Sequence, residues 1–255
     1  MWFAVDAEGP GARAWPLDAG GDGGEPSAAA SLPAGAEGLV IDGGAKAYDI
    51  ALPVPLSGLV RSDTSTGPKT LQVARPAGLA RLVGGQRLAR NPAQDANPRP
   101  WHACLCRADG QTVWAYGAEG QLRRLSVQPV ERVLRDLLRE LAAADGDDDL
   151  GFERGLSLTE AERDPAADLA QVIDEARAGR LKGEAVGANL AGVLIGHDAT
   201  NGIRLGRPGQ PVAVIGAGLM AQRYAIALGR FGVAVRRIDP DRALVAGAAF
   251  FAQCE

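Results

Sequence analysis

The chain has 255 residues, 46% hydrophobic and 23% charged, so it can bury one large core or two smaller ones without metals or disulfides. Its formal net charge of −4, with arginines scattered along the sequence, argues against nucleic-acid binding. Three cysteines, an odd number, make a disulfide framework a poor expectation and favour a reducing cytoplasm. Neither a secretory signal nor a membrane span of about eighteen apolar residues is indicated.

The N-terminal part predicts short strands joined by polar, glycine-rich stretches. Residues 2–5 and 39–41 are apolar and are expected to form two buried strands. Residues 62–100 contain so much Pro, Gly and Asn that we expect no long helix there. We place a lobe boundary at this point, which gives an N-terminal lobe of residues 1–100 and a C-terminal lobe of residues 101–255.

The C-terminal part has clearer patterns. Apolar runs separated by turn dipeptides predict an antiparallel meander over residues 101–128, and apolar residues at helical spacing predict a helix from Val130 to Leu141. Asp164 is a candidate N-cap, and Gly179 a candidate C-terminal stop, for the next helix. The later elements are expected to be helices at 165–178 and 183–195, a strand at 212–215, a helix at 219–230, a strand at 233–238 and a short helix from 241.

Two groups of side chains suggest metal ligands. His102, Cys104 and Cys106 alternate along an expected strand, but strand spacing of about 6.5–7 Å is too wide for three ligands of one tetrahedral zinc. The acidic run 145–149 begins like a calcium loop, yet Leu150 stands where that loop needs glycine. We expect a packed strand in the first case and a solvated loop in the second.

Several C-terminal segments resemble the 2-dehydro-3-deoxygalactonokinase family. Gly192–Asp198 is similar to the Gly-Leu-Leu-Ile-Gly-x-Glu helix of that family. Val214–Tyr224 takes the place of its strand, glycine turn and helix with an Ala-x-Arg-Tyr core. The segments Gly151–Leu156 and Val245–Ala248 also fit, so the resemblance covers roughly residues 151–255.

The N-terminus adds one more anchor to this resemblance. Residues 6–15 align without a gap to the Asp-Trp-Gly-Ser-Thr-Asn-Leu-Arg-Ala-Trp of the family and share Asp6, Arg13, Ala14 and Trp15. The resemblance implies an α/β, two-lobed actin/hexokinase-like (ribonuclease H-like) fold with mixed sheets, and ATP and Mg²⁺ between the lobes. It also implies a 2-keto-3-deoxy sugar acid as the phosphoryl acceptor. From the charge and the lack of a long apolar run we expect no nucleic-acid or membrane partner.

The residues that the resemblance implies for the site are Asp6 for the metal, Arg13 and Asp109 for catalysis, and Thr112, Gly216, Ala217 and Gly218 for the nucleotide. Asp6 ends a buried strand, where a carboxylate can hold magnesium through water or simply cap a turn. Asp109 is a candidate general base, although Asp109-Gly110 between apolar runs is also an ordinary hairpin signal. Both interpretations stay open for each aspartate.

The glycine turn has a second interpretation. Gly216, Gly218 and Ala221 match Gly-x-Gly-x-x-Ala after a strand, and Asp239 closes the next strand, which is the pattern of a dinucleotide-binding turn. The segment from Gly216 to residue 255 has just 40 residues, which is too short to supply the about five or six strands of a Rossmann sheet. We therefore favour an adenosine-binding turn and keep an NAD(P)-dependent oxidoreductase as an alternative.

The two phosphate loops depart from the family pattern. Glu8, Gly9 and Pro10 replace a glycine and two hydroxyl residues of the first loop, and residues 108–114 keep just Trp114 of the second. Pro10 also lacks the N–H group that a phosphate loop uses. These changes leave a second alternative, a catalytically degenerate paralogue that binds a ligand or partner. A homodimer is left open.

Overall fold

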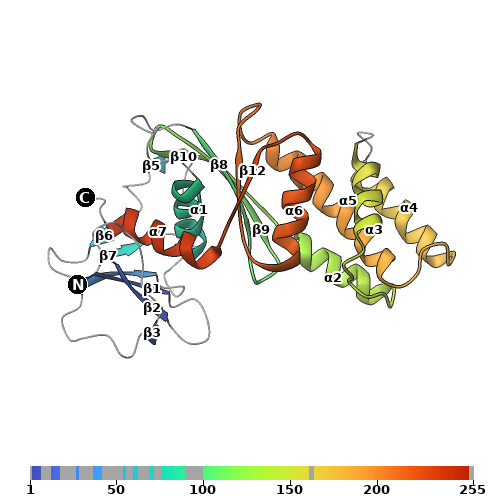
Figure 1. Ribbon diagram of the computed structural model, residues 1–255, viewed down its shortest axis with the longest axis horizontal. Coiled ribbons are helices and arrows are strands. Elements are labelled where there is room, and N and C mark those ends of the chain that lie inside the picture. The colour runs from blue at the N-terminus through green and yellow to red at the C-terminus, as the bar shows by residue number, and fades with distance from the viewer. Residues whose placement is uncertain are drawn as a thin grey trace.

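The structure is a computed structural model of the chain. It describes residues 2–6, 13–17, 27–28, 37–41, 54–55, 60–62, 69–71, 76–89, 100–160 and 164–252, with side chains described from residue 79 to residue 251 of these ranges. Its elements form an elongated array (Figure 1), with one sheet at the N-terminal end, a second sheet in the middle and a group of helices at the far end.

The elements of the N-terminal part are β1 (Trp2–Asp6), β2 (Arg13–Leu17), β3 (Ser27–Ala28), β4 (Glu37–Ile41), β5 (Val54–Pro55), β6 (Val60–Ser62), β7 (Lys69–Leu71) and α1 (Pro76–Ala89). They are followed by β8 (Trp101–Cys106), β9 (Thr112–Ala118), β10 (Gln121–Gln128), α2 (Val130–Glu140), α3 (Asp149–Thr159), α4 (Pro165–Arg177), α5 (Glu184–Ile203), β11 (Val212–Ile215), α6 (Gly218–Arg230), β12 (Val235–Ile238) and α7 (Pro240–Ala252). No helix among the described residues is long and apolar enough to cross a membrane.

Four neighbouring strands are arranged in the same way in both sheets. The first sheet runs β3-β2-β1-β4-β7-β6 and the second runs β12-β11-β8-β9-β10-β5. In each, the first strand (β1 or β8) pairs antiparallel with the next strand along the chain and parallel with a later one (β4 or β11). A second parallel strand (β7 or β12) follows on that side. The predicted α/β class with mixed sheets is confirmed, and the chain repeats one sheet topology.

Strands β8, β9 and β11 of the second sheet are buried on both faces, which explains their nearly continuous apolar sequences. Along β8, Ala103 and Leu105 face a core cluster shared with α1 and α7, whereas Cys104 faces a cluster built from α2 to α6. On β9, Val113 joins the first cluster and Trp114 the second. Successive side chains of a strand point to opposite faces, so β8 and β9 of the predicted meander each contribute to two cores.

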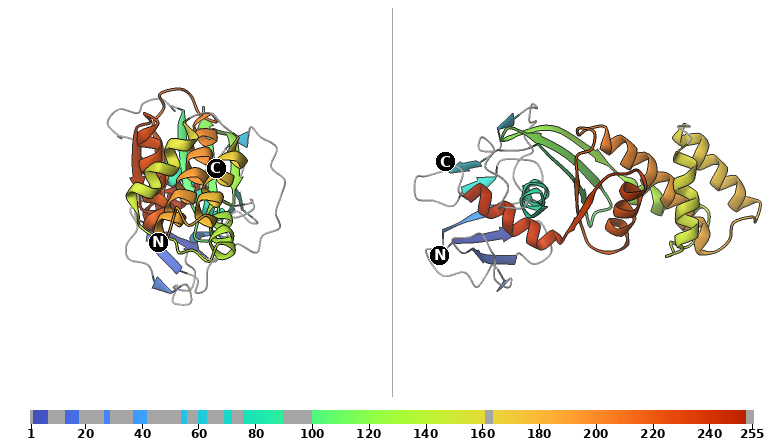
Figure 2. Two further views of the ribbon diagram at one scale, coloured as in Figure 1. Left: turned by 90° about the vertical axis from the view of Figure 1, so that its right-hand side faces the viewer. Right: turned by 45° about the horizontal axis from the view of Figure 1, so that its top comes forward.

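Helices α1 and α7 connect the two sheets, because each helix contacts the sheet that it does not directly follow in the sequence. Helix α1 follows the first sheet but packs on β8 and β11, whereas α7 follows the second sheet and reaches the strands β1, β2 and β4. Figure 2 shows α7 extending from β12 towards these N-terminal strands. Strand β5 also joins the second sheet. The boundary predicted near residue 100 stays a prediction, and these three elements cross it.

The expectation of no long helix in residues 62–100 is wrong, because α1 spans 14 residues there. Its glycines serve packing: a Cβ on Gly84 would overlap the Ala243 carbonyl oxygen and the Gly247 backbone nitrogen of α7. A Cβ on Gly247 would in turn overlap the Ala80 carbonyl oxygen. The two backbones touch directly at this crossing, so residues that look like helix breakers in the sequence are required by the tertiary structure.

The other helices follow their local signals more closely. Asp164 caps α4 by accepting a hydrogen bond from the Ala166 backbone nitrogen at 3.1 Å, and Gly179 follows the helix with φ of 69°, as predicted. Helix α5 extends to Ile203, beyond the expected end at residue 195. Helix α3 was not expected; its Gly155 lies against the backbone of α5.

His102 belongs to the core of the second sheet. Its ring lies 5.6 Å from the Trp114 ring and 6.4 Å from the Tyr116 ring, between centroids. Burial lowers the pKa of His102 to about 4, against a backbone hydrogen bond to Gly202 that acts in the opposite direction. Within the described ranges, no group of three or more His, Cys, Asp or Glu side chains is placed to hold a metal ion. The burial of residues 101–105 and these ring contacts agree with the packed-strand interpretation of this segment.

The glycine crossing predicts a large cost for one methyl group. Gly84→Ala should lower the free energy of unfolding by about 3 kcal/mol, because the new Cβ must push the backbone of α7 away. Denaturant unfolding measures this. Gly229→Ala is the matched control: Gly229 also lies inside a helix but has open space at its Cβ position, so helix propensity should leave stability unchanged or raised by up to about 1 kcal/mol. Equal losses of unfolding free energy in both variants would contradict the close contact between α1 and α7 at Gly84.

The buried histidine predicts a specific loss of stability in acid. The pKa of His102 is about 4 in the folded chain and about 6.5 in the unfolded chain, so the unfolded chain takes up the proton first. Stability should therefore fall as the pH drops from about 6.5 to about 4. In His102→Gln, the difference in unfolding free energy between pH 7.5 and pH 4.5 should be about 2 kcal/mol smaller than in the wild type. Parallel pH profiles of the two proteins would refute this.

Candidate functional site

Two turns leave the second sheet at the same edge. Strands β8 and β11 are parallel neighbours, with Leu105 opposite Ile215, so both end at this edge. The turn of residues 107–111 then leads from β8 to β9, and the turn at residues 216–218 leads from β11 into α6. A Cβ on Gly216 would lie 3.0 Å from the Cβ of Cys106, which shows how closely the start of one turn lies beside the other.

The turn at residues 216–218 exposes the start of α6. Gly216 is buried and its backbone nitrogen donates to the Ile238 carbonyl at 3.2 Å, whereas Ala217 and Gly218 are exposed. Gly218 has φ of 70°, a conformation that favours glycine. Ala217 occupies the N-cap position and supplies no side-chain cap. The first N–H groups of α6 therefore face a position where the helix dipole favours an anion.

Asp109 lies within the turn from β8 to β9. One of its carboxylate oxygens accepts from the Gln111 backbone nitrogen at 3.2 Å and from the Arg107 Nε at 3.2 Å. The side chain is 40% exposed, and Gly110 follows with φ of 80°. The hairpin interpretation of Asp109-Gly110 thus agrees with the geometry, and the carboxylate is also accessible at the sheet edge. Its role as a general base stays a prediction.

Thr112 faces the interior. Its Oγ1 lies 3.0 Å from the Tyr224 hydroxyl, and Tyr224 donates to Asp198 Oδ2 at 2.6 Å. Trp114 Nε1 donates to the same oxygen at 2.8 Å. All four residues are at most 6% exposed. Burial raises the pKa of the Asp198 carboxyl, and the hydrogen bonds from Trp114 and Tyr224 act against this. The predicted phosphate contact of Thr112 stays a prediction, and this geometry turns its hydroxyl towards α6.

A buried arginine holds the acidic loop against α6. Arg223 is 3% exposed and donates to Asp145 Oδ1 at 3.0 Å and to the Gly146 carbonyl at 2.5 Å. Its guanidinium also lies over the Phe152 ring, 5.6 Å from the centroid. Beside it is a small hollow against the first turns of α6. The hollow is lined by Asp147, Asp148, Asp149, Phe152, Leu219, Gln222, Arg223 and Ile226.

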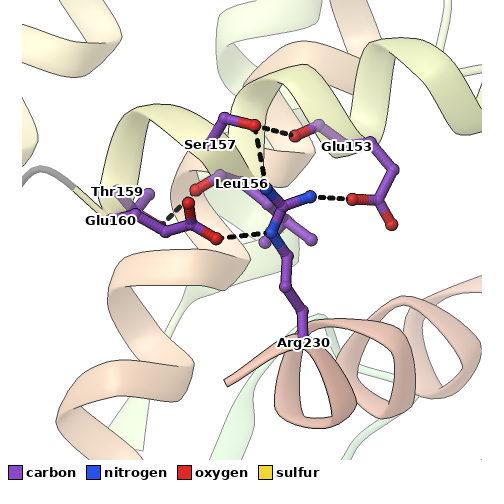
Figure 3. Close-up of polar contacts among 6 residues, drawn as sticks. All are labelled: Glu153, Leu156, Ser157, Thr159, Glu160 and Arg230. Carbon is purple, nitrogen blue, oxygen red and sulfur yellow. Dashed lines mark hydrogen bonds and ion pairs between the residues drawn. The ribbon is translucent and has the colours of Figure 1, made fainter. Parts of the chain in front are cut away.

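The far end of α6 is anchored by a second arginine (Figure 3). Arg230 donates to Ser157 Oγ at 3.1 Å and to the Glu153 carboxylate on α3, and to Oε1 of Glu160, the C-cap residue of α3, at 2.6 Å. Together with Arg223 and Tyr224, this contact fixes the middle and the end of α6. The start of the helix, next to the turn at residues 216–218, is the part left open to a ligand.

The predicted residues of the first loop can be placed by backbone alone. Asp6 ends β1 and Arg13 begins β2, and the two are register partners. Cys106 and Thr112 are the register partners at the same point of the second sheet, so the two hairpins are equivalent. The side chains of Asp6 and Arg13 are not described, and residues 8–10 lie outside the described residues. The roles of Asp6 and Arg13 stay predictions.

The sequence did not identify the buried network as a unit. Trp114, Asp198 and Tyr224 each appear in segments that resemble the kinase family, but nothing in the sequence shows that they meet. The available signal was chemical: a carboxylate at Asp198 in an otherwise apolar helix needs hydrogen-bond donors when buried. Tyr and Trp side chains on neighbouring apolar elements are the donors that such a position requires.

The comparisons with known proteins agree with the resemblance. A sequence profile of the 2-keto-3-deoxy-galactonokinase family matches residues 132–251. No curated protein matches the sequence significantly. Among solved structures, the chain is similar to a crystal structure from Sinorhizobium meliloti that carries a provisional assignment as a 2-dehydro-3-deoxygalactonokinase. The TM-score is 0.71, with 18% identity, over 99% of this chain and 96% of that chain.

The last comparison concerns the fold, because 18% identity is too low to carry more. The family profile concerns the sequence, and its range contains Phe152, Asp198, Arg223 and Tyr224, the residues that organise α6. It begins at residue 132, earlier than the segment 151–255 on which the resemblance was first seen. The predicted resemblance to the 2-keto-3-deoxy-galactonokinase family is thus confirmed over residues 132–251.

Proposed function

We propose that the chain is an ATP-dependent kinase that phosphorylates a hydroxyl group of a 2-keto-3-deoxy sugar acid in the cytoplasm. The observation that carries the proposal is the shared edge of the second sheet, where the turn with Asp109 lies beside the turn that opens α6. A kinase needs a base near the acceptor hydroxyl and a phosphate-binding turn next to it. The family match supports a sugar kinase as the general class.

The repeated sheet topology supports the two-lobed actin/hexokinase-like fold as part of this proposal. Each sheet has a hairpin directly after its first strand, β1–β2 in one and β8–β9 in the other. In a two-lobed kinase these hairpins are the two phosphate loops. Asp6 then stands at the start of the first loop, and Asp109 lies within the second. By register Asp6 corresponds to Cys106 and Arg13 to Thr112, so the duplication places both predicted carboxylates at equivalent hairpins, although not at equivalent positions within them.

The nucleotide would lie at the start of α6. The open N–H groups of this helix suit a phosphate, and Gly216 and Gly218 let the backbone approach it closely. The hollow beside Leu219 is too small to enclose a nucleoside, so the support for ATP is the open start of α6 together with the family match. For Mg²⁺ the support is the resemblance at Asp6, because that side chain is not described.

The chemistry of the proposal uses Asp109 and its turn. The acceptor hydroxyl gives its proton to the Asp109 carboxylate as its oxygen takes the phosphoryl group, and ADP is the leaving group. Arg107, which donates to Asp109, holds the carboxylate in place and brings a positive charge to the same turn. The proposal also assigns a catalytic role to Arg13, at the start of β2 in the first sheet and opposite Asp6.

A degenerate paralogue that binds a ligand without catalysis is the second candidate. It is favoured by one observation: Thr112 directs its hydroxyl to Tyr224, and Asp109 is engaged with its own turn. The NAD(P)-dependent alternative has less support. The turn at residues 216–218 lies in a mixed sheet, in which β9, β10 and β5 run antiparallel to their neighbours, and a dinucleotide fold is built on a mostly parallel sheet.

Nucleotide binding gives the first test of the proposal. At a concentration about 100 times its Kd, Mg-ATP should add about 2.7 kcal/mol of stability and raise the Tm by several degrees. NADH at the same concentration should leave the Tm unchanged. Asp6→Ala should remove the Mg-ATP shift if Asp6 holds the magnesium. Stabilisation by NADH alone would rule out the kinase, and stabilisation by neither would leave the degenerate paralogue.

The catalytic base gives the second test. Asp109→Asn should lower kcat for sugar-acid phosphorylation by about 10² to 10⁴, because the amide cannot accept the proton. The Mg-ATP thermal shift should persist in this variant. Asp136→Asn, on the exposed surface of α2, is the matched control and should keep the wild-type kcat. A wild-type rate in Asp109→Asn would show that Asp109 is a turn residue and no base.

A further inference from the structure

One hydrogen bond connects the two turns of the candidate site. Thr112 is the first residue of β9 and directly follows the turn that contains Asp109. Tyr224 lies in α6, the helix that begins at the turn of residues 216–218. The Thr112 Oγ1 and the Tyr224 hydroxyl are 3.0 Å apart. A bond from one turn's strand to the other turn's helix limits how far the turns can move relative to each other.

The Tyr224 hydroxyl is itself fixed from the other side. It donates to Asp198 Oδ2 at 2.6 Å, and Trp114 donates to the same oxygen at 2.8 Å. Because Trp114 is two residues beyond Thr112 on β9, this strand is attached to the network twice. Tyr224 is fully buried, so solvent water does not reach its hydroxyl from the surface. The network therefore acts as a fixed spacer between β9, α5 and α6.

The contacts around the two turns show what the spacer controls. The bonds of Asp109 to Gln111 and Arg107 shape its own turn. Gly216 bonds to the carbonyl of Ile238 on β12, on the opposite side from β8. Strands β8 and β11 are paired up to Leu105 and Ile215, and the hydrogen bond between Thr112 and Tyr224 is a further link between the strand that follows one turn and the helix that follows the other.

We propose that Tyr224 is a positioning residue that sets, through Thr112, the distance between the Asp109 turn and the turn at residues 216–218, and with it the affinity for Mg-ATP. The part of this inference that concerns Mg-ATP rests on the proposed function. The part that concerns the spacing of the turns does not. On this view, Thr112 contributes to nucleotide binding indirectly, by holding α6, and needs no contact with a phosphate.

The test compares two Tyr→Phe variants. Tyr224→Phe removes the spacer hydroxyl, whereas Tyr116→Phe makes the same change at a buried position towards the far end of β9. Tyr224→Phe should raise the KM for ATP about ten-fold and lower kcat, with the KM for the sugar acid unchanged. Tyr116→Phe should match the wild type. A merely structural defect would reduce the amount of active protein, which lowers kcat and leaves both KM values unchanged.

Thr112 provides the rescue experiment. Thr112→Ser keeps the hydroxyl and should behave as the wild type, whereas Thr112→Val keeps the shape and should behave as Tyr224→Phe. The double variant should be no worse than Tyr224→Phe alone, because the bond between Thr112 and Tyr224 is already absent from that single variant. Additive effects on the KM for ATP, or a normal KM for ATP in Thr112→Val, would overturn the inference.

A thiol readout separates this inference from the proposed function. Cys106 lies beside Gly216 and is half-buried, whereas Cys104 is fully buried. In a Cys254→Ser background, an aromatic disulfide reagent should label Cys106 about ten times faster in Tyr224→Phe than in Tyr116→Phe, without any nucleotide. Equal labelling rates would refute the positioning role. Absence of Mg-ATP binding and turnover in the wild type would refute the kinase, while the labelling rates would still decide the role of Tyr224.

Discussion

The direct contact between the backbones of α1 and α7 is the constraint on which the rest of the fold depends. Gly84 on one helix and Gly247 on the other leave no side chain between them, so the helices cross closely. Each helix follows one sheet in the sequence and packs on the other. The second sheet therefore takes part of its core from α1, and the short strands β1, β2 and β4 are contacted by α7, from the opposite end of the chain.

Local signals made about half of this fold predictable. Short sequence signals are enough to predict the β8–β10 meander, the amphipathic α2 and the capped α4. In α4 these signals are Asp164 at the N-cap and Gly179 after the last turn. Helix α1 was missed because Gly84 and Gly85 are required by a distant partner that the local sequence does not reveal. The repeated sheet topology was missed for a related reason: buried strands demand apolar residues but no particular ones, so two equivalent sheets need share no sequence pattern.

The candidate site divides in the same way. Its two turns were found from the sequence because glycine, aspartate and strand ends mark turns by their own chemistry. The hydrogen bonds among Thr112, Asp198 and Tyr224 were not found, since they join residues far apart in the chain. The residues that carry the family resemblance in the C-terminal part form this network and the contact of Arg223 with Phe152. The residues that resemble the family are therefore those that hold α6 in place, whereas the loops that would bind phosphate differ from the family pattern.

The contacts that hold α6 lie away from its start, the end that would face a ligand. The helix is fixed in its middle by Arg223 and Tyr224 and at its end by Arg230, and its first N–H groups remain free of side-chain caps within the described residues. A dipole held rigidly before the ligand arrives needs no reorganisation when charge appears in front of it, and this is the condition under which fixed dipoles stabilise charge most effectively. The buried anchors of α6 are thus the physical reason why its start can serve as an anion-binding position, whichever anion occupies it.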